Sequence, residues 1–309
     1  MNFSPFGRVV EIAENGRHLS KQDGFLVIEA GRERLGRVPL DDIAAVLATA
    51  PGTSVSCAAL SALSVRGIPI VLCGDKFLPS AIVWPLEGHH AQQRRMECQL
   101  DARLPLKKRL WAGLVAAKIQ HQGLVLADQG HDARRFHAMA RAVRSGDVDN
   151  LEAQAARRYW PLLMGEGFRR DQDAGGVNAL LNYGYAVLRA SAARAIVAAG
   201  LHPGLGIFHR HPHNMMPLAD DLMEVFRPFI DRRVNELVAG GTRDVTVFAK
   251  RALVDVLSDV LPTRAGQTPI STCLIRLAAS LGESYVGCSV DLDLPVFSSL
   301  GARLSDAEP

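Results

Sequence analysis

The chain has 309 residues, of which 48% are hydrophobic and 22% are charged, and its formal net charge is +3. This length exceeds the size at which one hydrophobic core normally keeps growing, so we expect two domains. No stretch reaches the roughly 18 uninterrupted apolar residues of a membrane span, and the first residues lack a basic region followed by an apolar run. We therefore expect a cytoplasmic protein without membrane contact.

Short β-type runs fill the first 85 residues and are separated by turn signals such as Pro51-Gly52. A short helix interrupts them over Cys57–Arg66, with Ser54 or Ser56 as its N-cap and Gly67 at its end. The pattern predicts a small, mainly β domain over residues 1–85, followed by a linker at 86–90. The runs are Phe25–Glu29, Ile43–Leu47, Ile68–Leu72 and Ala81–Trp84.

Helical periodicity dominates residues 91–309. We expect the polar tail after about residue 295 to be disordered. The predicted fold class is α+β with two domains, a mainly β N-terminal domain and a larger all-α domain. The expected helices lie near 91–127, 132–145, 149–164, 175–200, 218–239, 247–260 and 270–281.

An acidic pair lies at Asp221 and Glu224. On one continuous helix from Leu218, these two carboxylates project from the same flank of the apolar arc, whereas Asp220 lies on the solvent side. Carboxylates at this spacing repel each other unless a cation lies between them, and a divalent cation suits them. Acidic residues in the first turns of a helix also favour its dipole, so both interpretations stay open here.

Histidines at 209, 211 and 213 precede this pair. In an extended segment they point to one side, which permits a zinc site, but loop histidines are also commonly plain solvent-exposed residues. His209 stands out because the apolar Ile207 and Phe208 before it indicate a partly buried position.

Glu152 and the basic clusters each have a structural alternative. Asp149 and Glu152 have the spacing of a capping box, which gives Glu152 a purely structural task. Tandem arginines such as Arg157-Arg158 suit phosphate, but they are equally typical of solvated helix faces.

Taken together, several segments closely resemble the CRISPR-associated spacer integrase family, the universal adaptation protein of CRISPR systems and the first in the Cas numbering. Each segment is short, but their order and spacing are specific. One departure is His121, where an asparagine is common in the family. The segments are Leu151–Tyr159, Asn178–Tyr185, Gly206–His209 and Leu218–Pro228, with Thr53–Ser56 and Gly67–Val71 in the N-terminal part.

The resemblance implies a β domain followed by a helical catalytic domain whose metal ligands are Glu152, His209 and Glu224. Asp221 matches an auxiliary acidic position, as a further ligand or a supporting carboxylate. The implied cofactor is Mg²⁺ or Mn²⁺. The implied function is CRISPR adaptation: 3′-hydroxyl ends of a short DNA duplex attack repeat phosphodiesters to insert new spacers, and the family also has DNA endonuclease activity.

The implied partners are double-stranded DNA, as prespacer and CRISPR repeat, a second copy in a homodimer, and a small ferredoxin-like protein, the second in the Cas numbering. The length and the compact N-terminal domain look most like versions from systems with a single large effector nuclease. Expected DNA contacts come from Arg157, Arg158, Arg169, Arg170, Arg227, Arg232, Arg233, Lys250 and Arg251.

Three alternatives stay open. The first is a hydrolytic nuclease on branched DNA that uses the same site. The second is a non-catalytic DNA-binding subunit of the adaptation complex. The third is a zinc hydrolase built on His209, His211 and His213.

Overall fold

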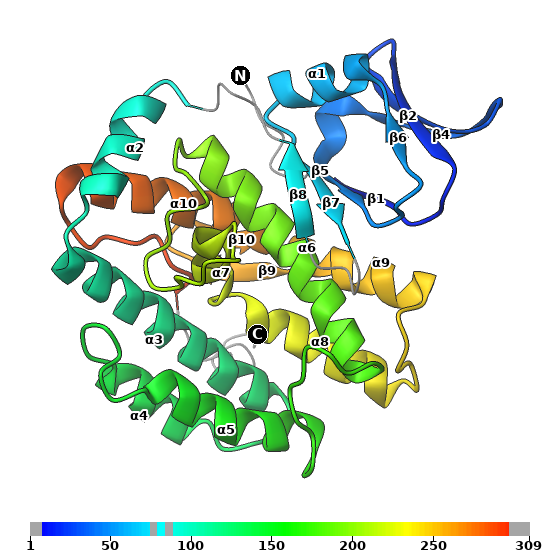
Figure 1. Ribbon diagram of the computed structural model, residues 1–309. Helices are drawn as coiled ribbons and strands as arrows, with labels where there is room; N and C mark the ends of the chain where they lie inside the picture. Colours follow the sequence, from blue (N-terminus) through cyan, green and yellow to red (C-terminus); the bar gives the residue numbers. More distant parts are fainter. Residues whose placement is uncertain (1–7, 75–78, 84–88, 297–309) are drawn as a thin grey trace, which may run out of the picture.

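The computed structural model describes residues 8–74, 79–83 and 89–296. Two four-stranded sheets and a short helix make up the N-terminal region, and helices dominate the rest of the chain (Figure 1). The N-terminal elements are β1 (Arg8–Ile12), β2 (Arg17–Gln22), β3 (Phe25–Ala30), β4 (Glu33–Pro39), the 3-10 turn η1 (Leu40–Asp42), β5 (Ile43–Ala48), β6 (Ser54–Val55), α1 (Cys57–Val65), β7 (Ile70–Cys73) and β8 (Pro79–Val83).

One sheet has the order β1-β5-β7-β8, and only β8 runs antiparallel to its neighbour. The central strands β5 and β7 are almost continuous apolar runs, which is typical of strands covered on both faces. Leu47 and Val71 of these strands pack against Ala190 of the helical region. This contact joins the strand-rich and the helical parts. The second sheet has the order β4-β3-β2-β6.

The predicted N-terminal helix is confirmed as α1. Its N-cap is Ser56, whose hydroxyl accepts the backbone N–H of Ala59, and not Ser54, which lies in β6. Gly67 follows the helix with φ of +67°, the left-handed conformation that glycine adopts without strain.

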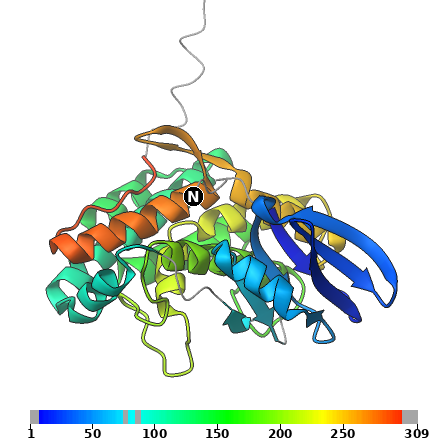
Figure 2. The same ribbon diagram turned by 90° about the horizontal axis from the view of Figure 1, so that it is seen from above.

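The last strand of the N-terminal region ends at Val83 and the helical region begins at α2; most of the predicted linker at 86–90 lies within residues 84–88, outside the described part. Figure 2 shows the sheets at one end of the molecule and most of the helices at the other. The elements are α2 (Gln92–Asp101), α3 (Leu104–Asp128), α4 (Arg134–Ala142), α5 (Leu151–Met164), α6 (Val177–Ala198), α7 (Pro217–Met223), α8 (Arg227–Ala239), α9 (Val247–Asp255), the 3-10 turn η3 (Val256–Ser258), β9 (Val260–Thr263), β10 (Gly266–Pro269) and α10 (Ile270–Gly287).

Two predicted helices are each divided in two. Residues 91–127 form α2 and α3, and residues 218–239 form α7 and α8. In both cases a proline, Pro105 or Pro228, lies in the first turn of the second helix, where its missing N–H costs nothing. Inside one continuous helix the proline ring would clash with the carbonyl four residues earlier, at Asp101 or Glu224, and the first helix of each pair ends at or just before that residue.

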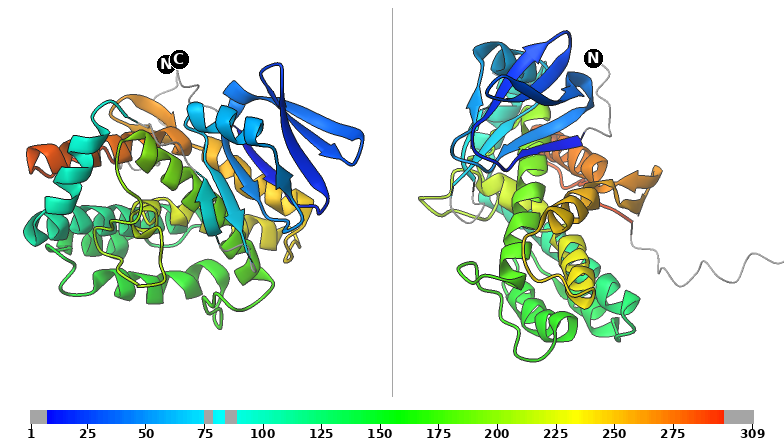
Figure 3. Two further views of the ribbon diagram at one scale, coloured as in Figure 1. Left: turned by 45° about the horizontal axis from the view of Figure 1, so that its top comes forward. Right: turned by 90° about the vertical axis from the view of Figure 1, so that its right-hand side faces the viewer.

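The prediction of an all-α C-terminal domain is wrong in one respect, because β9 and β10 form an antiparallel hairpin. The hairpin projects from the surface of the helical region in Figure 3. The predicted disordered tail lies almost entirely at residues 297–309, outside the described part of the chain.

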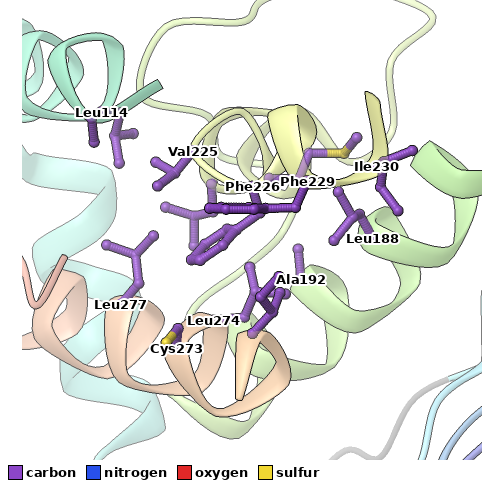
Figure 4. Packing of buried hydrophobic residues seen from close by; sticks show 14 of the residues in the cluster. Leu114, Leu188, Ala192, Val225, Phe226, Phe229, Ile230, Cys273, Leu274 and Leu277 are labelled. Atoms are coloured by element: carbon purple, nitrogen blue, oxygen red, sulfur yellow. The ribbon is translucent and has the colours of Figure 1, made fainter. Parts of the chain in front are cut away.

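Helix α6 contacts α7, α8, α9 and α10 as well as β5. Figure 4 shows the apolar packing around it, with Leu188 and Ala192 of α6 against Phe226, beyond α7, and Leu274 of α10. The same packing fixes the chain between α7 and α8, where the candidate site lies. In the part of the chain that the structure describes, no helix is long and apolar enough to cross a membrane.

Candidate metal centre and its cleft

The loop before α7 is tied to the fully buried carboxylate of Asp221. Asp221 Oδ2 accepts the backbone N–H groups of Ile207 at 2.6 Å and Phe208 at 3.2 Å, and Oδ1 accepts that of His209 at 3.1 Å. Oδ1 also lies 2.7 Å from His209 Nδ1. Because an ionised carboxylate only accepts, Nδ1 donates here, and Nε2 remains the nitrogen available to a ligand.

This hydrogen bond from His209 to Asp221 raises the pKa of His209, although burial of the ring acts in the opposite direction. The ring also packs edge-on against Trp111, with their centroids 5.6 Å apart. Trp111 in turn stacks on Phe208 at 4.3 Å. The orientation of His209 is therefore fixed by a carboxylate on one side and an aromatic ring on another.

Glu152, Glu224 and Lys118 form a second group, in which Glu224 is buried and the other two are partly buried. Glu152 lies in α5, Glu224 directly follows α7, and Lys118 is in α3. Lys118 Nζ lies 2.6 Å from Glu152 Oε1 and 2.6 Å from Glu224 Oε2. Burial alone would lower the pKa of Lys118, but the carboxylates of Glu224 and Glu152 outweigh it and the pKa is raised. The two predicted acidic ligands thus meet at one ammonium group.

Glu224 also pairs with Arg227, whose Nη1 lies 3.0 Å from Glu224 Oε1. Burial would raise the pKa of Glu224, yet Arg227 and Lys118 together lower it. The backbone beside Glu224 is held as well, because His121 Nδ1 donates to the carbonyl of Val225 at 2.6 Å. Burial lowers the pKa of His121 to about 4, so its ring is neutral.

These donors fit a hard divalent cation. The two carboxylates are ligands typical of Mg²⁺ and Mn²⁺, and the imidazole would add one nitrogen ligand to them. Glu224 Oε2 is buried, and its close partner among the described residues is Lys118 Nζ at 2.6 Å. This buried oxygen keeps unused acceptor capacity, which suits a cation ligand.

The side chains as they stand in the described residues include no group of three or more histidine, cysteine or acidic residues arranged to hold a metal. Lys118 lies between the two glutamates, and Asp221 engages the 207–209 backbone. His211 and His213 are exposed, with their ring centroids 5.6 Å apart. His211 lies at the same cleft as His209, but the described residues do not group the three histidines as a metal site.

Three geometric predictions need correction. Asp221 and Glu224 do not lie in one continuous helix to residue 239, because α7 ends at Met223 and Glu224 is its C-cap; Asp221 binds the 207–209 backbone, whereas Glu224 contacts Lys118. Asp220 does not face solvent, since Arg189 Nε lies 2.8 Å from Asp220 Oδ1 and the Asp220 side chain is 15% exposed. The first difference follows from the helix break before Pro228, and the second from Arg189 of α6, which packs over Asp220.

The capping box at Asp149 is also wrong. The backbone N–H groups of Leu151 and Glu152 donate to Asp147, and Asp149 instead pairs with Arg144 at 2.7 Å. The Glu152 carboxylate therefore does not cap the helix and instead contacts Lys118.

A cleft of about 460 Å³ contains His209 and Glu224 and is bordered by Arg170, Arg189 and Arg227. Tyr185 lies under two of these guanidinium groups, 4.8 Å from that of Arg227 and 5.4 Å from that of Arg170. Its hydroxyl donates to the buried Asp231. The cleft combines two of the candidate ligands, His209 and Glu224, with groups that bind phosphate.

The predicted DNA-contacting residues fall into three groups. Arg170 and Arg227 border the cleft, and Arg158 is partly buried in α5. Three others are engaged within the protein, namely Arg232 and Arg233 with Asp259, and Lys250 with Glu11. The exposed remainder is Arg157, Arg169 and Arg251.

The sequence indicated no role for Lys118, Arg189 or Tyr185. Each acts through a partner that is distant in the chain, so no local pattern reveals it. A second cleft, of about 720 Å³, lies between β1 and α9 and includes Lys250 but none of the candidate ligands.

The profile of the family described as CRISPR associated protein Cas1 matches residues 10–259. The CRISPR-associated endonuclease Cas1 of Neisseria meningitidis serogroup C (strain 8013) is 40% identical over 250 residues, which cover 80% of this chain and 82% of the relative. A casposase bound to integration product has the same fold, with TM-score 0.78, 18% identity and 95% coverage of both chains. A chain of a Cas6-RT-Cas1–Cas2 complex matches with TM-score 0.75 and 17% identity, over 97% of this chain and 37% of that one. The chain belongs to the Cas1 family of CRISPR-associated proteins.

Proposed function

We propose that this chain is the catalytic subunit for spacer insertion in CRISPR adaptation. A free 3′-hydroxyl of a short DNA duplex attacks a phosphodiester at the end of a CRISPR repeat. A phosphorus–oxygen bond forms to the incoming oxygen, the bond to the target strand's own 3′ oxygen breaks, and that oxygen takes up a proton. A second attack on the other strand completes the insertion, and no covalent bond to the protein is needed.

One observation carries this proposal. Glu152 and Glu224, from separate helical segments, converge on Lys118 beside a cleft that contains His209 and arginines. The name of the Neisseria relative, an endonuclease, and the integration product in the casposase structure both support chemistry on DNA phosphodiesters.

The proposed ligands of Mg²⁺ or Mn²⁺ are Glu152, His209 and Glu224, with Asp221 as the supporting carboxylate. Such a cation, when bound, activates the attacking hydroxyl and stabilises negative charge on the phosphate. Asp221 keeps the proton of His209 on Nδ1 and leaves the Nε2 lone pair free for ligation. Arg170 and Arg227 would hold DNA phosphates at the cleft without reading sequence.

We further propose that the active assembly contains a dimer of this chain and the small ferredoxin-like partner. The Cas6-RT-Cas1–Cas2 complex, whose chain shares this fold, supports a partner of that kind. It stays a prediction that this chain belongs to a CRISPR system with a single large effector nuclease.

Hydrolysis in the same site is the second candidate, supported by the endonuclease name of the Neisseria relative. Water then replaces the 3′-hydroxyl as the nucleophile, and the DNA is cut without being joined.

The test uses the full chain with its small partner, a supercoiled plasmid carrying a repeat, and a labelled short duplex with Mn²⁺. Integration predicts that label enters the plasmid only when the duplex ends in a 3′-hydroxyl, and that a 3′-deoxy duplex is inert. Plasmid cleavage that is equal with both duplexes and never transfers label would favour hydrolysis and contradict integration.

A further inference from the structure

Lys118 occupies the space between the two carboxylates that we assign to the metal. Its Nζ is 2.6 Å from an oxygen of each glutamate, and its side chain is only 12% exposed. Glu224 is 3% exposed, and Glu152 is 25% exposed. Two carboxylates this close and this buried would repel strongly or take up a proton without a positive charge between them. The ammonium therefore stabilises their ionised forms at one place.

The ion pairs around Lys118 balance in charge without a metal, and the nearby Asp221 is bound separately to His209 and its backbone. Glu152 and Glu224 contribute two negative charges, and Lys118 and Arg227 contribute two positive charges. A buried charge without a partner is costly, so a divalent cation added to this set leaves an excess of positive charge that must be offset. Either the ammonium withdraws, or new negative charge enters.

Lys118 can withdraw without any change in the helix that carries it. Its neighbours on α3, Leu114, Val115 and Ile119, are fully buried and fix the helix in the core. The lysine head is a point charge on a flexible stem of four carbons, so it can leave the carboxylates while the backbone stays in place.

We propose that Lys118 is a resident counter-ion that holds Glu152 and Glu224 together in the metal-free protein and competes with the divalent cation for them. This inference rests on the proposed function in one respect, namely that these glutamates are metal ligands. Its consequence is that the free protein binds metal weakly. DNA phosphates at the adjoining cleft supply negative charge, so DNA and metal strengthen each other's binding.

The test measures Mn²⁺ binding to the full chain without DNA by isothermal titration calorimetry. K118M keeps the length of the side chain and removes its charge, so we expect it to bind Mn²⁺ about tenfold more tightly than wild type, equivalent to about 1.4 kcal/mol. In EDTA the same variant should unfold at a lower temperature, because its carboxylates lose their counter-ion. K108M is the matched control, since Lys108 is an exposed residue of the same helix, and it should match wild type in both measurements.

Two further variants separate the effect of charge from an effect on folding. K118R keeps a positive charge and should not gain Mn²⁺ affinity, whereas K118Q repeats the neutral substitution if K118M does not fold. Equal or weaker Mn²⁺ binding by the neutral variants would overturn the competition while leaving the metal site intact. If folded wild type and neutral variants all fail to bind Mn²⁺, or if E152Q leaves that binding unchanged, the assigned metal site itself is contradicted.

Discussion

The carboxylate of Asp221 lies 2.7 Å from Nδ1 of His209 and also accepts the backbone N–H of His209. Because the same side chain binds two further N–H groups of that loop, one buried residue fixes both the path of the backbone and the tautomer of the ring. We expect the side-chain amide of D221N to bring an N–H donor close to these N–H groups, which need an acceptor. Mn²⁺ affinity should fall about 10- to 100-fold, as for other variants that lose the group orienting a ligand histidine.

Calorimetric titration of D221N with Mn²⁺ checks this prediction, and thermal unfolding shows whether the variant folds. A folded D221N with wild-type Mn²⁺ affinity would contradict the orienting role and leave Asp221 a purely structural residue.

Gly206 lies beside this carboxylate, directly before the residues whose N–H groups it accepts. A Cβ atom there would stand 2.6 Å from the carbonyl oxygen of His209 and 3.1 Å from Asp221 Oδ2. G206A should therefore lower the free energy of unfolding by about 1–3 kcal/mol and displace His209. Gly175 offers a control, because a Cβ there meets nothing within 4 Å. Urea unfolding of both variants tests this prediction. Equal stability of G206A and G175A would show that a Cβ atom at position 206 is tolerated, and would contradict the close contacts given above.

Asp231 gives the protein a pH dependence. Burial raises its pKa from 3.8 to about 7, so between these values the folded protein holds a proton that the unfolded chain has released. The contribution of this group to stability therefore falls as pH rises through that window. D231N removes the titration, and its stability relative to wild type should rise from pH 4.5 to pH 8 by an amount on the order of a few kcal/mol.

Urea unfolding of wild type and D231N at the two pH values measures this difference. Taking the difference between the two proteins cancels the titration of all other groups. A difference that stays constant with pH would show that Asp231 is ionised throughout.

Arg170 and Arg232 were both predicted to contact DNA, but only Arg170 borders the cleft. Arg232 pairs with Asp259 at 3.0 Å. If Arg170 neutralises a phosphate, R170Q should weaken DNA binding and reduce the slope of log K against log salt by about 1. R232Q should leave the slope unchanged. Fluorescence anisotropy over a salt series checks both, and equal slopes for the two variants would remove Arg170 from the DNA surface.

The order of elements was predictable in part from the sequence. The apolar runs located β3, β5, β7 and β8 but not β1, β2, β4 and β6, and helical periodicity located the helical region. The sequence also contains the prolines that mark the helix breaks, Pro105 and Pro228. Helical periodicity continues across both positions, and for this reason the sequence analysis predicted continuous helices. The β9–β10 hairpin was missed because Pro262 argues against a strand.

The candidate site was predictable only in part. The resemblance identified Glu152, His209 and Glu224, but local spacing misassigned Glu152 to a capping box because Asp147, not Asp149, caps α5. Lys118 could not be found, since its partners lie 34 residues and more away along the chain. Such contacts come from tertiary packing, which single-sequence patterns do not encode.

The central claim is that Glu152 and Glu224 act in DNA joining. The most direct measurement compares transfer of a labelled 3′-hydroxyl duplex into a repeat plasmid by wild type, E152Q, E224Q and D149N. Asp149 is an exposed acid close to Glu152 that pairs with Arg144, so D149N controls for lost charge nearby. We predict that E152Q and E224Q bind DNA normally but join it at least about 100-fold more slowly, while D149N joins like wild type. Wild-type joining by folded E152Q and E224Q would contradict the account and assign this chain a non-catalytic role on DNA.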